Sequence, residues 1–166
     1  MKNIKKNYTI SIKLLVFLIL LIGCSSKEKD SATVVLNDIQ IYKTGLSSLK
    51  NENYKKAIIE FDNLSLNHPF SSLAKKSDIM TAYSLYQNNE IKKSISKLKI
   101  FIEMNPNDEF SDYAHYLLAM CYYIQVSNQG RDPSLSIKAL NPFMLIITKY
   151  PNSKYAKDSK MKIQYI

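Results

Sequence analysis

Few side chains in this 166-residue chain have the chemistry that catalysis requires. The two histidines are isolated, because His68 lies in a proline turn and His115 lies inside a predicted helix, so they lack the spacing of metal ligands. Asp112 stands one turn before His115, but no nucleophile accompanies the pair, and a surface or groove histidine is the simpler interpretation. With three glycines in all, the chain has no glycine-rich phosphate loop. The sequence therefore predicts a protein that is not an enzyme and holds no metal.

Cys24 is the residue whose position indicates covalent chemistry. Lysines precede an apolar run, Leu14 to Ile22, which is too short to cross a bilayer as a helix, where about 20 residues are needed. This pattern fits a signal peptide. The following Leu21-Ile22-Gly23-Cys24 resembles the lipobox of bacterial lipoproteins. That resemblance implies N-acyl and S-diacylglycerol groups on Cys24 and no other cofactor. Because Ser25 follows, it also implies the outer membrane, facing the periplasm. The alternative is an ordinary signal peptide or a membrane anchor with a chance cysteine.

These signals divide the chain into three parts. Residues 1–23 are predicted to be a lipoprotein signal peptide, and residues 24–36 the lipidated N-terminus and a polar tether. Residues 37–166 are predicted to be a repeat domain, with truncation at its C-terminus left open. Cys121 lies in an apolar helical stretch without a disulfide partner, so we interpret it as a small core residue.

The net charge of +9 falls to about +5 when the four lysines of the signal peptide are removed. Lysine pairs such as Lys55-Lys56 and Lys92-Lys93 fit the solvated faces of amphipathic helices. The alternative is attraction to anionic lipid headgroups or to an acidic partner. No base-reading motif is present, so nucleic acid is not an expected partner.

One spacing pattern occurs three times in the chain. A small residue is followed four residues on by a large apolar residue and eight residues later by a proline. The copies are Ala57-Phe61-Pro69, Ser94-Leu98-Pro106 and Ala139-Phe143-Pro151, with further small residues at Gly45, Ala82 and Ala119 on the preceding helices. This is the signature of the tetratricopeptide repeat, in which small residues let two helices approach and the proline ends the second helix. The sequence therefore predicts an all-α, tetratricopeptide-like helical-hairpin solenoid of about three repeats.

Turn signals separate the expected helices. These helices are predicted at about 37–50, 54–67, 72–87, 90–104, 110–126, 134–149 and 154–166. Pro142 falls inside the sixth of them, where it removes a backbone hydrogen bond and crowds the preceding turn. We therefore expect a kink at Pro142.

The aromatic residues indicate a binding surface, since the chain has twelve tyrosines and no tryptophan. In tetratricopeptide arrays the first helix of each hairpin lines the concave face. The candidate peptide groove on these helices consists of Tyr42, Tyr83, Tyr86, Tyr113, Tyr116 and Tyr123. The alternative is that these rings pack inside the array, because a tyrosine ring can pack while its hydroxyl stays in water.

Five stretches carry a more specific resemblance: His68-Pro69-Phe70-Ser71, Ala82-Tyr83, Phe101-Ile102-Glu103-Met104-Asn105-Pro106, Arg131-Asp132-Pro133 and Lys149-Tyr150-Pro151-Asn152-Ser153-Lys154-Tyr155. Together they resemble the BamD family of outer-membrane β-barrel assembly lipoproteins. The resemblance covers residues 37–166 and the lipobox. It implies a subunit that docks on a BamA-like barrel subunit within a larger assembly complex. It also implies that the N-terminal repeats receive unfolded outer-membrane proteins through a C-terminal segment ending in an aromatic residue.

Two departures from that family limit what the resemblance implies. The family has more repeats and binds BamA through the C-terminal ones, whereas this sequence stops at Ile166, so the BamA-docking surface is not carried over. The loop from Ser127 to Asp132 is also shorter than is usual in the family. A second interpretation is another periplasmic tetratricopeptide lipoprotein that acts as a scaffold, for example in coordinating cell-envelope synthesis with division. The identity of the partner distinguishes the two interpretations.

Overall fold

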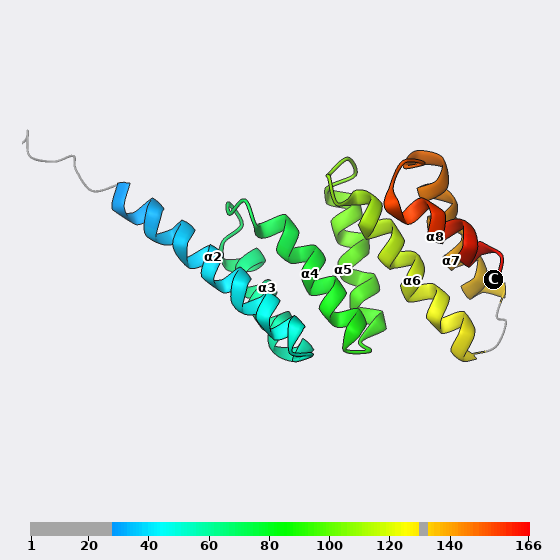
Figure 1. The fold of residues 1–166 in the computed structure, drawn as a ribbon, viewed down its shortest axis with the longest axis horizontal. Coiled ribbons are helices and arrows are strands. Elements are labelled where there is room, and N and C mark those ends of the chain that lie inside the picture. The colour runs from blue at the N-terminus through cyan, green and yellow to red at the C-terminus, as the bar shows by residue number, and fades with distance from the viewer. Residues whose placement is uncertain (1–27, 130–132) are drawn as a thin grey trace, which may run out of the picture. The chain divides into compact units, whose positions relative to one another are not determined.

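The computed structural model describes residues 28–129 and 133–166, and the chain divides into two compact units, Met1–Val35 and Leu36–Ile166. The described residues form helices and no strand (Figure 1). The helices are α2 (Glu28–Lys50), α3 (Tyr54–Asn67), α4 (Ala74–Gln87), α5 (Ile91–Met104), α6 (Ser111–Gln129), α7 (Pro133–Lys149) and α8 (Lys154–Ile163). The predicted all-α class is confirmed, and α3 to α8 begin and end within three residues of their predicted bounds. The predicted signal peptide, Cys24 and residues 130–132 lie outside the described residues.

Each of α3, α5 and α7 ends in the same kind of turn, which explains why every copy of the repeat has a proline. The turns are His68–Ser71, Asn105–Asp108 and Tyr150–Ser153, and in each the last N–H donates to the first carbonyl oxygen. A proline is the second residue of all three. Proline suits that position because its fixed φ matches the turn and because it cannot continue the helix that has just ended.

The turns inside the first two hairpins also repeat. Glu52 has a φ of 57° and Asn89 a φ of 61°, and the two residues are one 37-residue step apart. After each of them, a backbone N–H reaches back to the preceding helix, from Asn53 to the Ser48 carbonyl at 2.8 Å and from Glu90 to the Leu85 carbonyl at 2.9 Å. A left-handed residue followed by such a bond is a common way to end a helix. The step equals that from Pro69 to Pro106, so the two hairpins share one construction.

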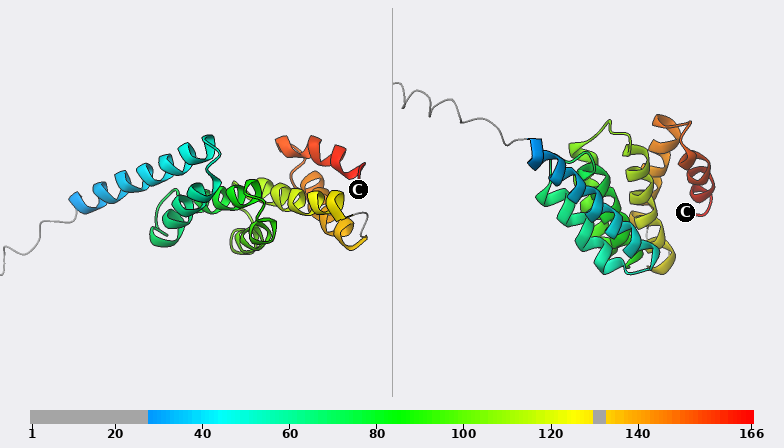
Figure 2. Two further views of the ribbon diagram at one scale, coloured as in Figure 1. Left: turned by 90° about the horizontal axis from the view of Figure 1, so that it is seen from below. Right: turned by 60° about the vertical axis from the view of Figure 1, so that its left-hand side comes forward.

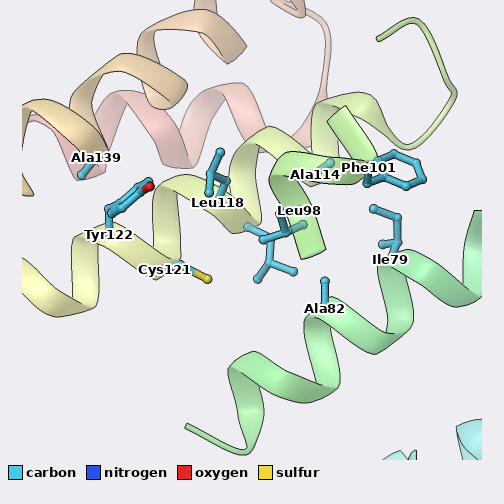
Figure 3. Close-up of a cluster of buried hydrophobic side chains, with 10 residues drawn as sticks. Ile79, Ala82, Leu98, Phe101, Ala114, Leu118, Cys121, Tyr122 and Ala139 are labelled. Carbon is cyan, nitrogen blue, oxygen red and sulfur yellow. The ribbon is translucent and has the colours of Figure 1, made fainter. Parts of the chain in front are cut away.

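The predicted close helix contacts are confirmed. The small residues at these positions are all fully buried: Ala57, Ala82, Ser94, Ala119 and Ala139. Ser94 on α5 donates a hydrogen bond from its Oγ to the Ala82 carbonyl oxygen of α4 at 2.8 Å. Cys121 of α6 lies on the other side of Ser94, with its Sγ 3.4 Å from the Ser94 Oγ. Ser94 therefore connects three helices, and its partners Ala82 and Cys121 belong to the core shown in Figure 3.

In the first hairpin the close contact lies between Gly45 of α2 and Phe61 of α3. A Cβ atom added at Gly45 would lie 2.7 Å from the Phe61 ring, which is closer than any side chain tolerates. Phe61 itself is fully buried, as are Leu98 and Phe143 at the equivalent positions of the next two copies. The glycine therefore lets a full phenylalanine ring fill the space between two helices.

The helices stack in the order of the chain, each packing on the next from α3 to α8. In addition α4 contacts α6, and α6 contacts α8, so the first helices of successive hairpins are neighbours. Figure 2 shows α5 on one side of α4 and α6, with α8 on the other. This is the tetratricopeptide arrangement, and the predicted fold is confirmed for the described residues.

Two features differ from the expected helix pattern. The first helix begins at Glu28 rather than near residue 37, so part of the segment that was expected to be a tether is helical. Once a helix is nucleated, each further residue adds one hydrogen bond, and Glu, Lys and Ala in this segment favour helix. The helix α7 continues through Pro142. The kink expected at Pro142 stays a prediction.

Ser94 and Ser96 offer a matched test of the close helix contact. Ser94→Leu places two extra heavy atoms where the helices touch and removes the bond to Ala82, so it should lower the free energy of unfolding by about 2–4 kcal/mol. Ser96→Leu, at an exposed site on the same helix, should change it by less than about 0.5 kcal/mol. Urea unfolding followed by circular dichroism measures both values. Equal effects of the two substitutions would contradict the helix packing described here.

Candidate functional site: a tyrosine cluster on the first helices

The two histidines lie in different surroundings, and each has its own packing contacts. His68 in the turn after α3 places its Nδ1 2.8 Å from a carboxylate oxygen of Asp38 on α2. His115 on α6 is half-buried, and burial, followed by the charge of Lys149, lowers its pKa. Asp112 does not orient His115; its carboxylate accepts a hydrogen bond from the Ser153 hydroxyl at 2.6 Å. Among the described residues no group of three or more His, Cys, Asp or Glu side chains could hold a metal ion.

Three tyrosine rings meet where α6 packs beside α8. Tyr155 of α8 stacks on Tyr116 of α6, with ring centroids 4.8 Å apart and an interplanar angle of 22°. The Tyr155 ring also lies 5.2 Å from that of Tyr113, one turn earlier on α6. The Tyr116 hydroxyl donates to the Asp158 carboxylate of α8 at 2.6 Å, which fixes its ring against that helix. These contacts hold aromatic surface from two neighbouring hairpins together.

Two more tyrosines extend this surface onto α4. Tyr83 and Tyr86 are both partly buried and pack against the core formed by α4, α5 and α6. The Tyr83 hydroxyl accepts a hydrogen bond from the Gln87 Nε2 at 2.7 Å. The phenol groups of both residues also influence the pKa of Tyr113 on α6. We call Tyr83, Tyr86, Tyr113, Tyr116 and Tyr155 the tyrosine cluster.

Burial favours the neutral form of three hydroxyls of the cluster. It raises the pKa of Tyr86, Tyr113 and Tyr116 above the ordinary value, and Asp158 raises that of Tyr116 further. A neutral phenol can donate and accept hydrogen bonds, while its ring offers apolar surface. The cluster can therefore bind an aromatic or aliphatic side chain together with a polar backbone group, which is what an extended peptide presents.

The structure places the six predicted groove residues in three different surroundings. Tyr83, Tyr86, Tyr113 and Tyr116 lie in the cluster. Tyr123 lies farther along α6, where its ring packs edge-on against Phe143 at 6.2 Å and lies under the Lys162 ammonium.

Tyr42 belongs to a different core from the rest. It is only 8% exposed and packs on Phe61, with ring centroids 5.4 Å apart. Tyr42 is therefore packed inside the array. Gly45 leaves room for the Phe61 ring beside α2, and Tyr42 on the same helix packs on that ring.

Sequence reasoning missed Tyr155, which is central to the cluster. A signal for it existed: Ala156 lies 37 residues after Ala119 and 74 after Ala82, which marks α8 as a further first helix. Tyr155 stands next to that small residue and so lies at the contact with α6. Cys121, in contrast, has the predicted role of a buried core residue, and burial raises the pKa of its thiol to about 11.

The fold and this site define a class of protein, a tetratricopeptide-like helical repeat domain with a tyrosine-lined surface on its first helices. In the part of the chain that the structure describes, no helix has the length and apolar character to cross a membrane. A family model named YfiO, described as "Outer membrane lipoprotein", matches residues 36–166. The chain belongs to this family.

Curated relatives agree with the family. The chain is 36% identical over 153 residues to the outer membrane protein assembly factor BamD of Rickettsia prowazekii, covering 92% of this chain and 61% of the relative. It is 31% identical over 147 residues to the protein of the same name from Caulobacter vibrioides, covering 87% and 48%. With the one from Vibrio cholerae it shares 25% identity over 162 residues, covering 90% and 65%. The chain thus spans about half to two thirds of the length of these relatives.

The tyrosine cluster predicts a specific response to alkaline pH. Because the folded state raises the pKa of Tyr113, the stability contributed by its neutral form is complete below the ordinary pKa of about 10. It is lost as the pH rises through the folded-state value. Between about pH 8.5 and 11.5, wild type should therefore lose more unfolding free energy than Tyr113→Phe, which cannot ionise.

Tyr165 provides the control, since it is 76% exposed and lies outside the cluster. Tyr165→Phe should follow the wild-type pH profile in the same denaturant titrations. If Tyr113→Phe also follows wild type, Tyr113 ionises as freely in the folded protein as in the unfolded chain, and the burial described for the cluster is wrong.

Proposed function

We propose that this chain is a lipid-anchored subunit of the machinery that assembles outer-membrane proteins, and that its tyrosine cluster receives an extended C-terminal segment of an unfolded client. Membership of an outer membrane lipoprotein family and relatives named outer membrane protein assembly factor support the role. The chain acts by binding and positioning, not by catalysis. Its partners are a BamA-like barrel subunit, other subunits of the assembly complex and the unfolded clients themselves, with no nucleic acid among them.

The observation that carries the proposal is the geometry of the tyrosine cluster. Its rings come from three successive first helices, α4, α6 and α8, so the cluster runs across the repeats rather than along one helix. An extended segment that crosses the repeats therefore meets several rings in turn. A client that ends in an aromatic residue gains most from such a surface, because aromatic pairs contribute about 0.5–1.5 kcal/mol beyond their buried area.

The relatives favour this role over the scaffold interpretation. Those from three organisms carry the same assembly-factor name, and none of the three is named for cell-envelope synthesis or division.

The anchor is the second part of the proposal. The lipobox-like sequence supports acylation of Cys24, and two or more acyl chains give stable membrane binding.

Cys24→Ala tests the anchor separately from the tyrosine cluster. The variant should accumulate as an unlipidated precursor, because the cysteine thiol is the acceptor of the diacylglycerol group. Mass spectrometry of the membrane fraction measures both cleavage and acylation. A Cys24→Ala protein that is processed like wild type would show that the lipobox interpretation is wrong.

Peptide binding tests the tyrosine cluster. A labelled peptide with the C-terminal sequence of an outer-membrane β-barrel protein, ending in Phe, should bind weakly, because an unfolded segment must be ordered on docking. Tyr83→Ala or Tyr86→Ala should weaken binding about fivefold or more, which corresponds to about 1 kcal/mol. Fluorescence anisotropy measures the dissociation constants, and circular dichroism checks that helical content is unchanged.

Two controls make the result specific. Tyr165→Ala removes an exposed tyrosine outside the cluster and should bind the peptide like wild type. A peptide that lacks its terminal Phe should bind less well to wild type. If the truncated peptide binds equally, or if all variants bind alike, the cluster is internal packing and does not receive the client.

A further inference from the structure

All three second helices of the hairpins carry exposed large hydrophobic side chains, as does α2, where Ile39 and Leu46 are exposed. Each second helix carries two of them: Ile59 and Leu66 on α3, Ile100 and Met104 on α5, and Ile137 and Met144 on α7. Met104 is 74% exposed and Leu66 is 70% exposed. The described side chains of α4 and α6, by contrast, include no exposed large hydrophobic residue. In soluble proteins, exposed apolar patches often mark a site that contacts a protein, a ligand or a membrane.

Positive charge also lies on these helices, as it does on α8, which carries four lysines and one acidic residue, Asp158. Together α3, α5 and α7 carry eight lysines against three acidic residues, Glu60, Asp62 and Glu103, whereas lysines and acidic residues balance on α4 and α6. The helix α5 has four of these lysines, and α7 has no acidic residue. Lysines that alternate with exposed apolar residues on a helical face are typical of surfaces that lie on anionic membranes. We call the exposed side of α3, α5 and α7 the second-helix face.

A hollow lies between α3 and α5. Its volume is about 380 Å³, with Leu85 and Ile100 among its lining residues and Lys92 and Lys93 at its edge. Thr81 also lines it; within the described part of the chain this side chain is fully buried and its hydroxyl has no hydrogen-bond partner.

One carboxylate in the hollow must be accounted for, because it would repel an anion. Asp62 lines the hollow, but Lys97 lies 2.9 Å from it and 3.0 Å from Asp78. The two carboxylates raise the pKa of Lys97 against the opposing effect of its burial, so its ammonium stays charged between them. Lys92 is exposed at the rim, where it can meet a negatively charged headgroup.

We propose that the second-helix face docks on the surface of a bilayer that contains anionic phospholipid. Lysines attract the headgroups, and exposed side chains such as Ile100 and Met104 enter the boundary between headgroups and acyl chains. The inference relies on the membrane location of the proposed function but not on the tyrosine cluster, which lies on other helices. Docking would hold the repeats against the membrane and leave α4 and α6 free to receive a client.

An environment-sensitive fluorophore tests the proposal on the full lipidated chain. Met104→Cys is labelled with NBD; the native Cys121 is buried, and a sample without the added cysteine gives the background. The protein is reconstituted in vesicles of phosphatidylcholine alone or with phosphatidylglycerol. Only phosphatidylglycerol vesicles should shift the emission to the blue and allow quenching by brominated lipid, and salt should reverse both effects.

Charge reversal gives the matched comparison. Lys92→Glu with Lys99→Glu, on α5, should abolish the blue shift, while Lys157→Glu with Lys160→Glu, two exposed lysines of α8, should leave it unchanged. Because the acyl anchor is the same in all variants, loss of the shift reports loss of docking and not loss of anchoring. The client peptide should bind all of them alike, which separates failure here from failure of the tyrosine cluster.

Three results would overturn the proposal. The first is NBD emission that shows no blue shift on either kind of vesicle, which would indicate that the second-helix face binds a protein partner. The second is a shift that is independent of phosphatidylglycerol and salt. The third is a shift that grows with protein concentration without vesicles, which would assign the face to a second copy of this chain.

Discussion

The close approach of two helices at a small residue is the constraint on which the rest of this structure depends. At Gly45 the backbone of α2 lies directly against the Phe61 ring, and at Ala82 and Ser94 the helices α4 and α5 touch without a large side chain between them. These contacts set the distance between the two helices of a hairpin. That distance decides where the next hairpin packs, because the large residue one turn on fills the space between hairpins. Repeating the contact every 37 residues brings α4, α6 and α8 into a row, and the row brings their tyrosines together.

The sequence predicted the fold well because proline and small residues act locally. A proline after His68, Asn105 or Tyr150 fixes both the end of a helix and the turn that follows, so these ends can be read without tertiary information. The start of α2 at Glu28 could not be read in this way, since a polar segment with good helix formers remains compatible with helix or with an open tether.

The candidate site was only partly predictable. Spacing placed four of the cluster tyrosines on one face, but it could not distinguish them from Tyr42, which packs on Phe61, nineteen residues away in the chain. Contacts between distant residues, such as Tyr116 with Asp158 or Lys97 with Asp62 and Asp78, depend on how hairpins stack and leave no local pattern. Tyr155 was missed because α8 was not recognised as a further first helix.

The account's central claim is that the first helices form one binding surface from several repeats. NMR spectra of the protein with selectively labelled tyrosine rings test it most directly. Adding the barrel-protein peptide should move the signals of Tyr83, Tyr86, Tyr113, Tyr116 and Tyr155 together, with one dissociation constant, and leave those of Tyr42 and Tyr165 in place. Shifts confined to one helix, or centred on Tyr42 or Tyr165, would contradict a surface that runs across the repeats.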